Sequence, residues 1–317
     1  MSLRQRLSLL LLASLATACG GPLEEPASEF ATREDAVTIP ARGSASTLDF
    51  GNWNLEWFGS TSNGPTNESL QLSNARDVLS GADLDIWGLE EVVSTTSFNS
   101  LKSQLTGYAG LLANDATVTN GSAYYSSSEQ KVGLLYKTSV ASVLSARVIL
   151  TAYDSDFAGR PPLEVKLRVG LNGHTEDLVV IVLHAKAFDD TTSWQRRSNA
   201  SQALKSYLDS TYPATKVMVF GDWNDDVDTS ITSGNASPYK NFVDDSADYS
   251  FPTKALSDAR IATTASYPDA IDHQLVTNEL KAYYVSGSAQ AYRVDSYISN
   301  YSNTTTDHFP VLSRYNW

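Results

Sequence analysis

The chain has 317 residues, with 23 Lys and Arg, 36 Asp and Glu, four His and a single Cys. One cysteine excludes an intramolecular disulfide framework, and a hydrophobic share of 42% excludes a chain that is disordered throughout. The net charge of −13 argues against a surface that is basic throughout, as a protein that coats nucleic acid would need.

The first residues have the pattern of an export signal. Arg4 and Arg6 precede the apolar run 7–15, and small residues follow at positions 16–18. A basic segment, a short apolar segment and small residues at the cleavage point are typical of secretory signals. The apolar run is too short for a transmembrane helix, which needs about 20 residues. We therefore expect the chain to be exported.

Cys19 follows these small residues directly. Residues 1–19 resemble the signal and lipobox of bacterial lipoproteins, in which the cysteine at this place is lipidated, although Ala16 stands where Leu is usual. The resemblance implies an outer-membrane or cell-surface lipoprotein anchored through Cys19, with a secreted or periplasmic protein as the alternative. Residues 20–46 are rich in Gly, Pro, Ala, Ser, Thr and Glu without periodicity, which predicts a flexible tether.

From residue 47 onward, short apolar runs alternate with turn residues, which predicts one folded domain over 47–317. Helical spacing occurs at 68–80, 97–105 and 193–209, and the polar stretch 225–260 predicts a long surface excursion next to a site. Few helices among many strands, without a regular strand–helix alternation, favour a layered α+β domain. The strands that we expect are 48–55, 84–89, 108–113, 131–137, 143–150, 163–170, 178–184, 216–220, 271–277, 281–286, 291–295 and 309–314.

Five short segments each place a carboxylate, an amide or an imidazole at the end of a predicted strand. They are 52–59, 85–92, 180–188, 219–225 and 306–311. Taken singly, each has a structural explanation, because Asn and Asp favour turns and a histidine after apolar residues can belong to the core. Functional groups often gather where strands end, so the five segments together indicate a site.

Oxygen donors dominate these segments and suit a hard divalent cation such as Mg²⁺, Mn²⁺ or Ca²⁺. The donors are Asn54, Glu91, Asp222, Asn224 and Asp307. His184 and His308 add imidazoles that titrate near neutrality, the range that proton transfer requires. Hydrolysis of a phosphate ester needs an activated water, a cation on the phosphate and a protected leaving oxygen. These residues therefore predict a metal-dependent phosphoester hydrolase.

In this order, the five segments resemble the endonuclease/exonuclease/phosphatase superfamily, and the deoxyribonuclease I-like branch within it, over about residues 48–315. The resemblance implies a four-layer α/β sandwich, in which helices flank two packed mixed sheets and the site lies at one end. The sequence departs from the family pattern at three positions. Glu90 stands where Gln is usual, Val182 where Asn or Thr is common, and Thr306 where Ser is common.

The resemblance also implies roles for individual residues. The implied metal site comprises Glu91, Asn54, Asp222 and Asp307. The implied catalytic residues are His184, His308, Asp272, Glu129, Asp222 and Asn224, with Arg160 and Asn224 on the substrate phosphate. In this scheme His308, oriented by Asp272, is the base for the attacking water. His184, oriented by Glu129, donates a hydrogen bond or a proton toward the leaving oxygen or the phosphate.

We expect a monomeric, exported, DNase I-like endonuclease that hydrolyses DNA or RNA phosphodiesters. The net charge opposes binding of a polyanion, so cations near the cleft would have to offset it. The candidates are Lys131, Arg160, Lys186, Arg196 and Arg197. A phospholipid phosphodiesterase or phosphatase of the same fold, similar to sphingomyelinases or phosphoinositide phosphatases, is the alternative. A more distant alternative is an inactive lipoprotein that serves as a binding scaffold.

Overall fold

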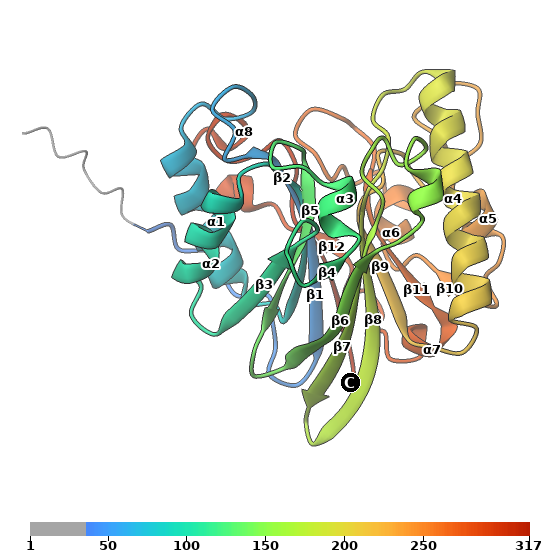
Figure 1. The fold of residues 1–317 in the computed structure, drawn as a ribbon, viewed down its shortest axis with the longest axis horizontal. Helices are drawn as coiled ribbons and strands as arrows, with labels where there is room; N and C mark the ends of the chain where they lie inside the picture. The colour runs from blue at the N-terminus through green and yellow to red at the C-terminus, as the bar shows by residue number, and fades with distance from the viewer. Residues whose placement is uncertain (1–35) are drawn as a thin grey trace, which may run out of the picture. The chain divides into compact units, whose positions relative to one another are not determined.

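The computed structural model describes residues 36–317, which form one compact unit. The predicted export segment, Cys19 and the first part of the predicted tether lie outside the described residues. Two mixed β-sheets pack face to face (Figure 1). The first sheet contains, in spatial order, β12 (Gln290–Ala291), β13 (Val311–Tyr315), β1 (Leu48–Phe58), β2 (Ile86–Val92), β5 (Lys131–Lys137) and β3 (Tyr108–Leu112). The second contains β10 (Tyr249–Ser250), β11 (Asp272–Thr277), β9 (Val217–Asp222), β8 (His174–His184), β7 (Leu163–Leu171), β6 (Ala141–Val148) and β4 (Val118–Thr119).

Helices cover the outer face of each sheet (Figure 1). Helices α1 (Glu68–Ala82) and α2 (Thr95–Gln104) pack on the first sheet, and α4 (Thr191–Thr211) packs on the second. The connections contain the short helices α3 (Gly121–Tyr124), η1 (Thr151–Tyr153), α5 (Lys240–Val243), α6 (Lys254–Asp258), α7 (Asn278–Lys281), η2 (Val294–Ser296) and α8 (Tyr301–Thr304). This arrangement confirms the four-layer sandwich. Within residues 36–317, no helix combines the length and the apolar character that a membrane crossing requires.

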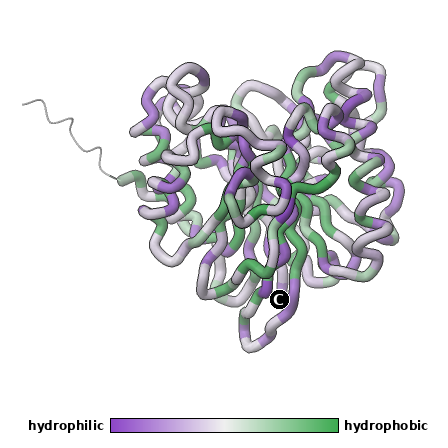
Figure 2. Tube along the Cα trace, viewed as in Figure 1, coloured by the Kyte–Doolittle hydropathy of each residue, from purple (hydrophilic) through white to green (hydrophobic). Residues whose placement is uncertain are grey.

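Alternating side chains along the strands build three apolar layers. Phe50 of β1 and Phe220 of β9 belong to the cluster between the two sheets, whereas Trp53 of β1 packs outward beneath α1 and α2. Ile181 of β8 likewise packs outward beneath α4. Figure 2 shows the hydrophobic residues gathered along the strands and more hydrophilic residues on the helices and loops. Because strand side chains point alternately to the two faces, each strand presents a fixed set of residues to the interior.

The two sheets approach each other closely just below the site. A Cβ atom at Gly88 of β2 would lie 2.0 Å from a ring carbon of Phe220, so only glycine fits there. A polar bridge also crosses the interior: Asn52 donates to the carbonyl of Gly221 at 3.1 Å and accepts from Gln274 at 3.0 Å. These buried contacts fix how the strand ends of one sheet face those of the other.

Several expected elements differ in the structure. The predicted strand 281–286 contains only an isolated bridge at Tyr284, and the predicted strand 291–295 is reduced to β12 followed by η2. Segment 225–260 is folded rather than a surface excursion, since it includes α5, β10 and α6 and buries Phe242. Residues 36–46 are not a tether either, because Ile39 is buried against the α1 cluster and Arg42 and Gly43 both donate to the carbonyl of Ala82.

Candidate active site

Strand register brings three of the expected residues side by side. His184 ends β8, Asp222 ends β9 and Asp272 begins β11, and the pairing sets His184 opposite Asp222 and Asp222 opposite Asp272. Side chains opposite each other on neighbouring strands point to the same face. These three lie in line with inner-face residues such as Val182 and Phe220, so they face the first sheet across the interior.

Asn54 and Glu91 come from the first sheet to meet them. The Asn54 amide donates to Asp222 Oδ2 at 2.9 Å and to Glu91 Oε1 at 3.1 Å. Glu91 has a φ of 59° at an irregularity in the pairing of β2. Its other oxygen accepts from the backbone N–H of Trp57 at 3.0 Å and from the side chain of Gln130. Glu91 is therefore held from both sides with its carboxylate at the strand ends.

Asp222 lies at the centre of the group. Its Oδ2 lies 3.5 Å from His184 Nε2 and 3.9 Å from His308 Nε2. Its Oδ1 accepts from the backbone N–H of Asn224 at 2.9 Å. Burial, helped by the negative charge of Asp272, raises the pKa of Asp222 to about 7.

His308 forms a buried pair with Asp272. Its Nδ1 lies 2.9 and 3.1 Å from the two carboxylate oxygens of Asp272, which leaves Nε2 facing Asp222 and, at 3.8 Å, Asp307. Burial alone would lower the pKa of His308, but Asp272, Asp222 and Asp307 outweigh it and raise this pKa well above its ordinary value. A carboxylate on Nδ1 fixes the tautomer and orients the ring, which is the arrangement expected of a general base.

His184 has a different environment. Burial lowers its pKa well below the ordinary value, with Arg160 and His308 acting in the same direction, so the neutral imidazole is favoured. Its Nε2 lies 3.7 Å from Glu91 Oε1, and its Nδ1 has no hydrogen-bond partner in the structure. Glu129 does not reach this ring, contrary to expectation. It is exposed and accepts a hydrogen bond from the backbone of Ser126 in its own loop.

Gln130, the neighbour of Glu129, points into the site instead, although it was not among the expected site residues. Its amide donates to Glu91 and its oxygen accepts from Arg160. Arg160 also donates to the carbonyl of Ala185 at 3.0 Å, and Asn224 donates to the same carbonyl at 3.2 Å. The structure thus places Arg160 and Asn224 on one side of the site, next to His184.

Two of the expected cations, Lys131 and Arg197, are buried and bound within the protein. Lys131 is fully buried and donates to backbone carbonyls, including that of Val93 at 2.7 Å. Arg197 is also fully buried, in an ion pair with Asp225 at 2.8 Å. Arg160, Lys186 and Arg196 are partly exposed and leave positive charge near the site.

Two further carboxyl groups, Glu56 and Glu90, lie beside the site without having been among its expected residues. Glu56 accepts from the backbone N–H of Asp307 at 3.0 Å, and burial together with the charge of Asp307 raises its pKa to about 7. Glu90 is fully buried on the inner face with neither oxygen hydrogen-bonded, and burial raises its pKa well above the ordinary value. Burial therefore favours the neutral acid at Glu90, so this residue adds no negative charge to the site.

The donor set fits a hard divalent cation. Ligand atoms of Glu91, His184 and Asp222 lie within 4.8 Å of one another, as do those of Asp222, Asp272 and His308. Asn54 does not offer a ligand atom here, contrary to expectation, because its Nδ2 faces both carboxylates and its oxygen accepts from the backbone N–H of Glu56. Burial raises the pKa values of Asp222 and Glu56, neighbouring carboxylates act in the same direction, and a bound cation would favour the charged form of both groups.

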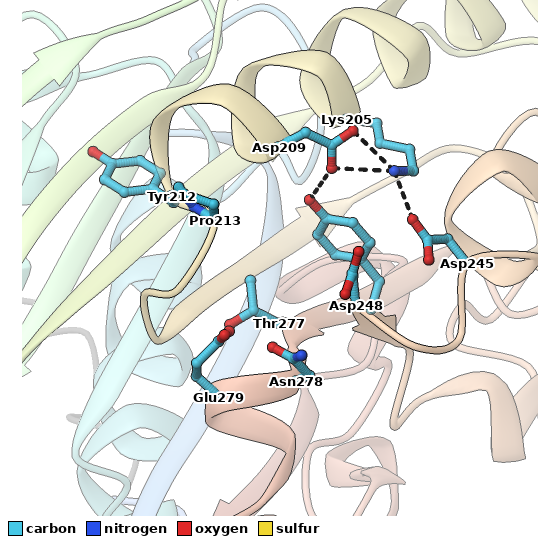
Figure 3. A pocket seen from close by; sticks show the side chains of 10 residues that line it. Lys205, Asp209, Tyr212, Pro213, Asp245, Asp248, Thr277, Asn278 and Glu279 are labelled. Atoms are coloured by element: carbon cyan, nitrogen blue, oxygen red, sulfur yellow. Dashed lines mark hydrogen bonds and ion pairs between the residues drawn. The ribbon is translucent and has the colours of Figure 1, made fainter.

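A separate pocket of about 300 Å³ lies between the C-terminal end of α4 and the end of β11 (Figure 3). Its lysine, Lys205, is already paired with Asp209 at 2.9 Å and with Asp245 at 2.7 Å. Thr277, in the pocket wall, ends the strand that Asp272 begins, so the pocket lies at the opposite end of the sheet from the site. It therefore contributes nothing to the active-site group.

A family model for the endonuclease/exonuclease/phosphatase family matches residues 51–308. The chain belongs to this family. Members of the family hydrolyse phosphoesters, and the matched region contains Asn54, Glu91, His184, Asp222 and His308. The comparison confirms the family resemblance seen in the sequence.

Solved structures of several enzymes share the fold. They include TDP2 of D. rerio complexed with a single-strand DNA product (13% identity, TM-score 0.57, 86% of this chain and 100% of that one). An AP endonuclease from Archaeoglobus fulgidus matches with 16% identity and a TM-score of 0.57 over 85% of this chain and 100% of its own. A mannosyl-6-phosphatase from Bacteroides thetaiotaomicron matches with 12% identity and a TM-score of 0.51 over 84% and 98%. No curated protein sequence matches the chain.

Proposed function

We propose that this protein is an exported, divalent-metal-dependent phosphodiesterase that cuts nucleic acid as an endonuclease. One observation carries the proposal. The Nε2 atoms of His184 and His308 both face Asp222 Oδ2, at 3.5 and 3.9 Å, in a group that also includes Glu91 and Asn54. Two imidazoles of opposite pKa shift beside a cluster of oxygen donors supply what hydrolysis of a phosphate ester requires.

The residues divide the chemistry between them. Glu91 and Asp222, which Asn54 holds in place, would bind Mg²⁺ or Mn²⁺ with Asp307 nearby, and the bound cation would polarise the phosphate and offset the charge that develops on it. His308 accepts the proton of the attacking water at Nε2 while its Nδ1–H donates to Asp272. His184 is held neutral, so we assign to it a hydrogen bond toward the phosphate or the leaving oxygen rather than a proton.

Substrate phosphate is expected between this group and the side of the site that Arg160 and Asn224 occupy. Both residues donate to the carbonyl of Ala185, and Arg160 is fixed further by Gln130. Fixed cationic and amide donors are the groups that stabilise non-bridging phosphate oxygens. Nucleic acid as the substrate is supported by the shared fold with the DNA-bound TDP2 and with the AP endonuclease.

A paired assay of residues 36–317 tests the proposal. Supercoiled plasmid and mixed phospholipid vesicles are each incubated with the protein and Mg²⁺, then with excess chelator. We expect the plasmid to be nicked, and we expect chelator and His308→Ala each to abolish nicking. Release of a phosphorylated headgroup without nicking would replace the nuclease by the phospholipid hydrolase. Inactivity on both, with Mg²⁺ or Mn²⁺, would leave the scaffold hypothesis.

Export and a lipid anchor at Cys19 are part of the same proposal, as is a monomeric state. They are supported by the order of basic, apolar and small residues before Cys19. Expression of the full chain in a bacterial host tests them, since a lipidated protein partitions with membranes and Cys19→Ser would release it.

A further inference from the structure

One aromatic side chain near the site is exposed to an unusual degree. Phe188 is 68% exposed and has a φ of 79°. A bulky residue with positive φ is a genuine outlier, and such outliers gather where strain serves binding or catalysis. Phe188 follows His184 by only four residues, so the chain between them spans at most about 14 Å. The exposed ring therefore lies on the loop that leaves the active site, within about 14 Å of His184.

The loop that presents this ring is fixed by buried groups. The carbonyls of Lys186 and Phe188 both accept from Arg197 Nη1, at 2.8 and 2.7 Å. Arg197 is itself fully buried and paired with Asp225, which is also fully buried. At the start of the loop, the carbonyl of Ala185 accepts from the proposed phosphate-binding side chains. The unusual backbone conformation of Phe188 is thus imposed by the fold.

Lys186 adds a positive charge at the ring. Its Nζ lies 4.2 Å from the centroid of the Phe188 ring and over it. The ammonium group covers one face of the ring. Because the side chain is largely exposed, the opposite face is open to a ligand. Aromatic platforms beside cationic groups are the recurring means by which proteins hold unpaired bases, because every base has a face that can stack.

We propose that Phe188 is a stacking residue that holds the base of a nucleotide next to the scissile phosphate, while Lys186 lies near its phosphate. The inference rests on the proposed nuclease function and specifies its substrate as nucleic acid with an unpaired base. The same ring could instead enter a lipid surface. Its neighbours argue against this, because Asp189 and Asp190 are both exposed beside it and a ring that entered the membrane would carry their charges toward the apolar layer.

Binding of two small phosphates tests the inference without requiring turnover. Deoxyadenosine 5′-monophosphate and 2-deoxyribose 5-phosphate are titrated by calorimetry in Mg²⁺; they differ only in the base. We expect wild type to bind the nucleotide roughly 5- to 100-fold more tightly than the sugar phosphate. Phe188→Ala should remove this preference and Phe188→Trp should keep it. Leu144→Ala, which removes an apolar side chain that is 49% exposed on β6, is the matched control and should change nothing.

The outcomes separate this inference from the nuclease proposal. If wild type nicks plasmid but binds both phosphates equally, the stacking role is wrong and the nuclease stands. If the preference exists and survives Phe188→Ala, the stacking role is also wrong. If Phe188→Ala removes the preference in a protein that does not cut nucleic acid, the stacking role stands and the nuclease proposal fails. A variant that loses only its binding to phospholipid vesicles would assign Phe188 to membrane contact instead.

Discussion

Replacement of Asp272 by Asn probes the base that the proposed mechanism requires. The carboxylate lies 2.9 and 3.1 Å from His308 Nδ1, and both side chains are buried. Loss of its charge leaves the ring without the group that fixes its tautomer. General acid–base catalysis contributes about 10²–10⁴ in rate, so we expect Asp272→Asn to lower kcat by about that factor. Asp272 is not assigned to substrate, so KM should change by less than about threefold.

The same variant should shift the pH dependence in a defined direction. Against the lowering effect of burial, Asp272 is the largest of the influences that raise the pKa of His308. His308 must be neutral to accept a proton, so activity rises as the pH passes its pKa. Removal of Asp272 lowers that pKa and therefore moves the acid limb of the residual activity to lower pH.

The assay is kcat and KM on a fluorescent oligonucleotide from pH 5 to 9, with thermal unfolding as the check on folding. Asp49→Asn is the matched control, because Asp49 is a fully buried carboxyl at the start of β1, at the other end of the sheet from the site. It should keep the wild-type profile. A folded Asp272→Asn enzyme with kcat within about threefold of wild type and an unmoved acid limb would refute the role of the pair.

Three further predictions concern buried or partly buried side chains near the site. Arg197→Met should lower the free energy of unfolding by about 3–5 kcal/mol in a urea titration, because Asp225 is left buried without its partner. A second substitution, Asp225→Leu, should restore much of the lost stability. A loss below about 1 kcal/mol in Arg197→Met would contradict this role of the pair. Gln130→Leu should weaken Mn²⁺ binding by about tenfold in calorimetry, since Gln130 supports Glu91, and unchanged affinity would argue against that support. Glu90→Gln should stabilise the metal-free protein more at pH 7 than at pH 4.5. Because burial raises the pKa of Glu90 in the folded state, the stability of the wild type falls as the pH rises above the ordinary glutamate pKa. An equal gain in stability at both pH values would contradict a protonated, buried Glu90.

The sequence was sufficient to predict the sheets and much of the site because both depend on short-range patterns. Apolar runs at 131–137 and 163–170 became β5 and β7 almost residue for residue. His184, Asp222 and Asp272 each stand at a strand end, and their common inner face follows from the two-residue period of a strand. Functional groups at the ends of buried strands are therefore visible before the fold is known.

The choice between adjacent residues could not be made in this way. Glu129 and Gln130 precede the same strand, and only the register of β5 against β2 shows that Gln130 turns toward Glu91. The roles of the cations could not be predicted from the sequence either. Basic residues in the candidate segments suggested substrate binding, but Lys131 and Arg197 are buried and donate to backbone carbonyls. The exposure of Phe188 likewise depends on hydrogen bonds from a helix that begins after it.

The proposed mechanism requires a divalent cation on Glu91 and Asp222, whose carboxylates Asn54 holds in place. Anomalous scattering from crystals of residues 36–317 soaked in Mn²⁺ would locate this cation. We expect a manganese peak within coordination distance of a carboxylate oxygen of Glu91, and loss of that peak in Glu91→Gln. A manganese ion bound elsewhere, with none at Glu91 in an enzyme that still cuts its substrate, would refute this metal site.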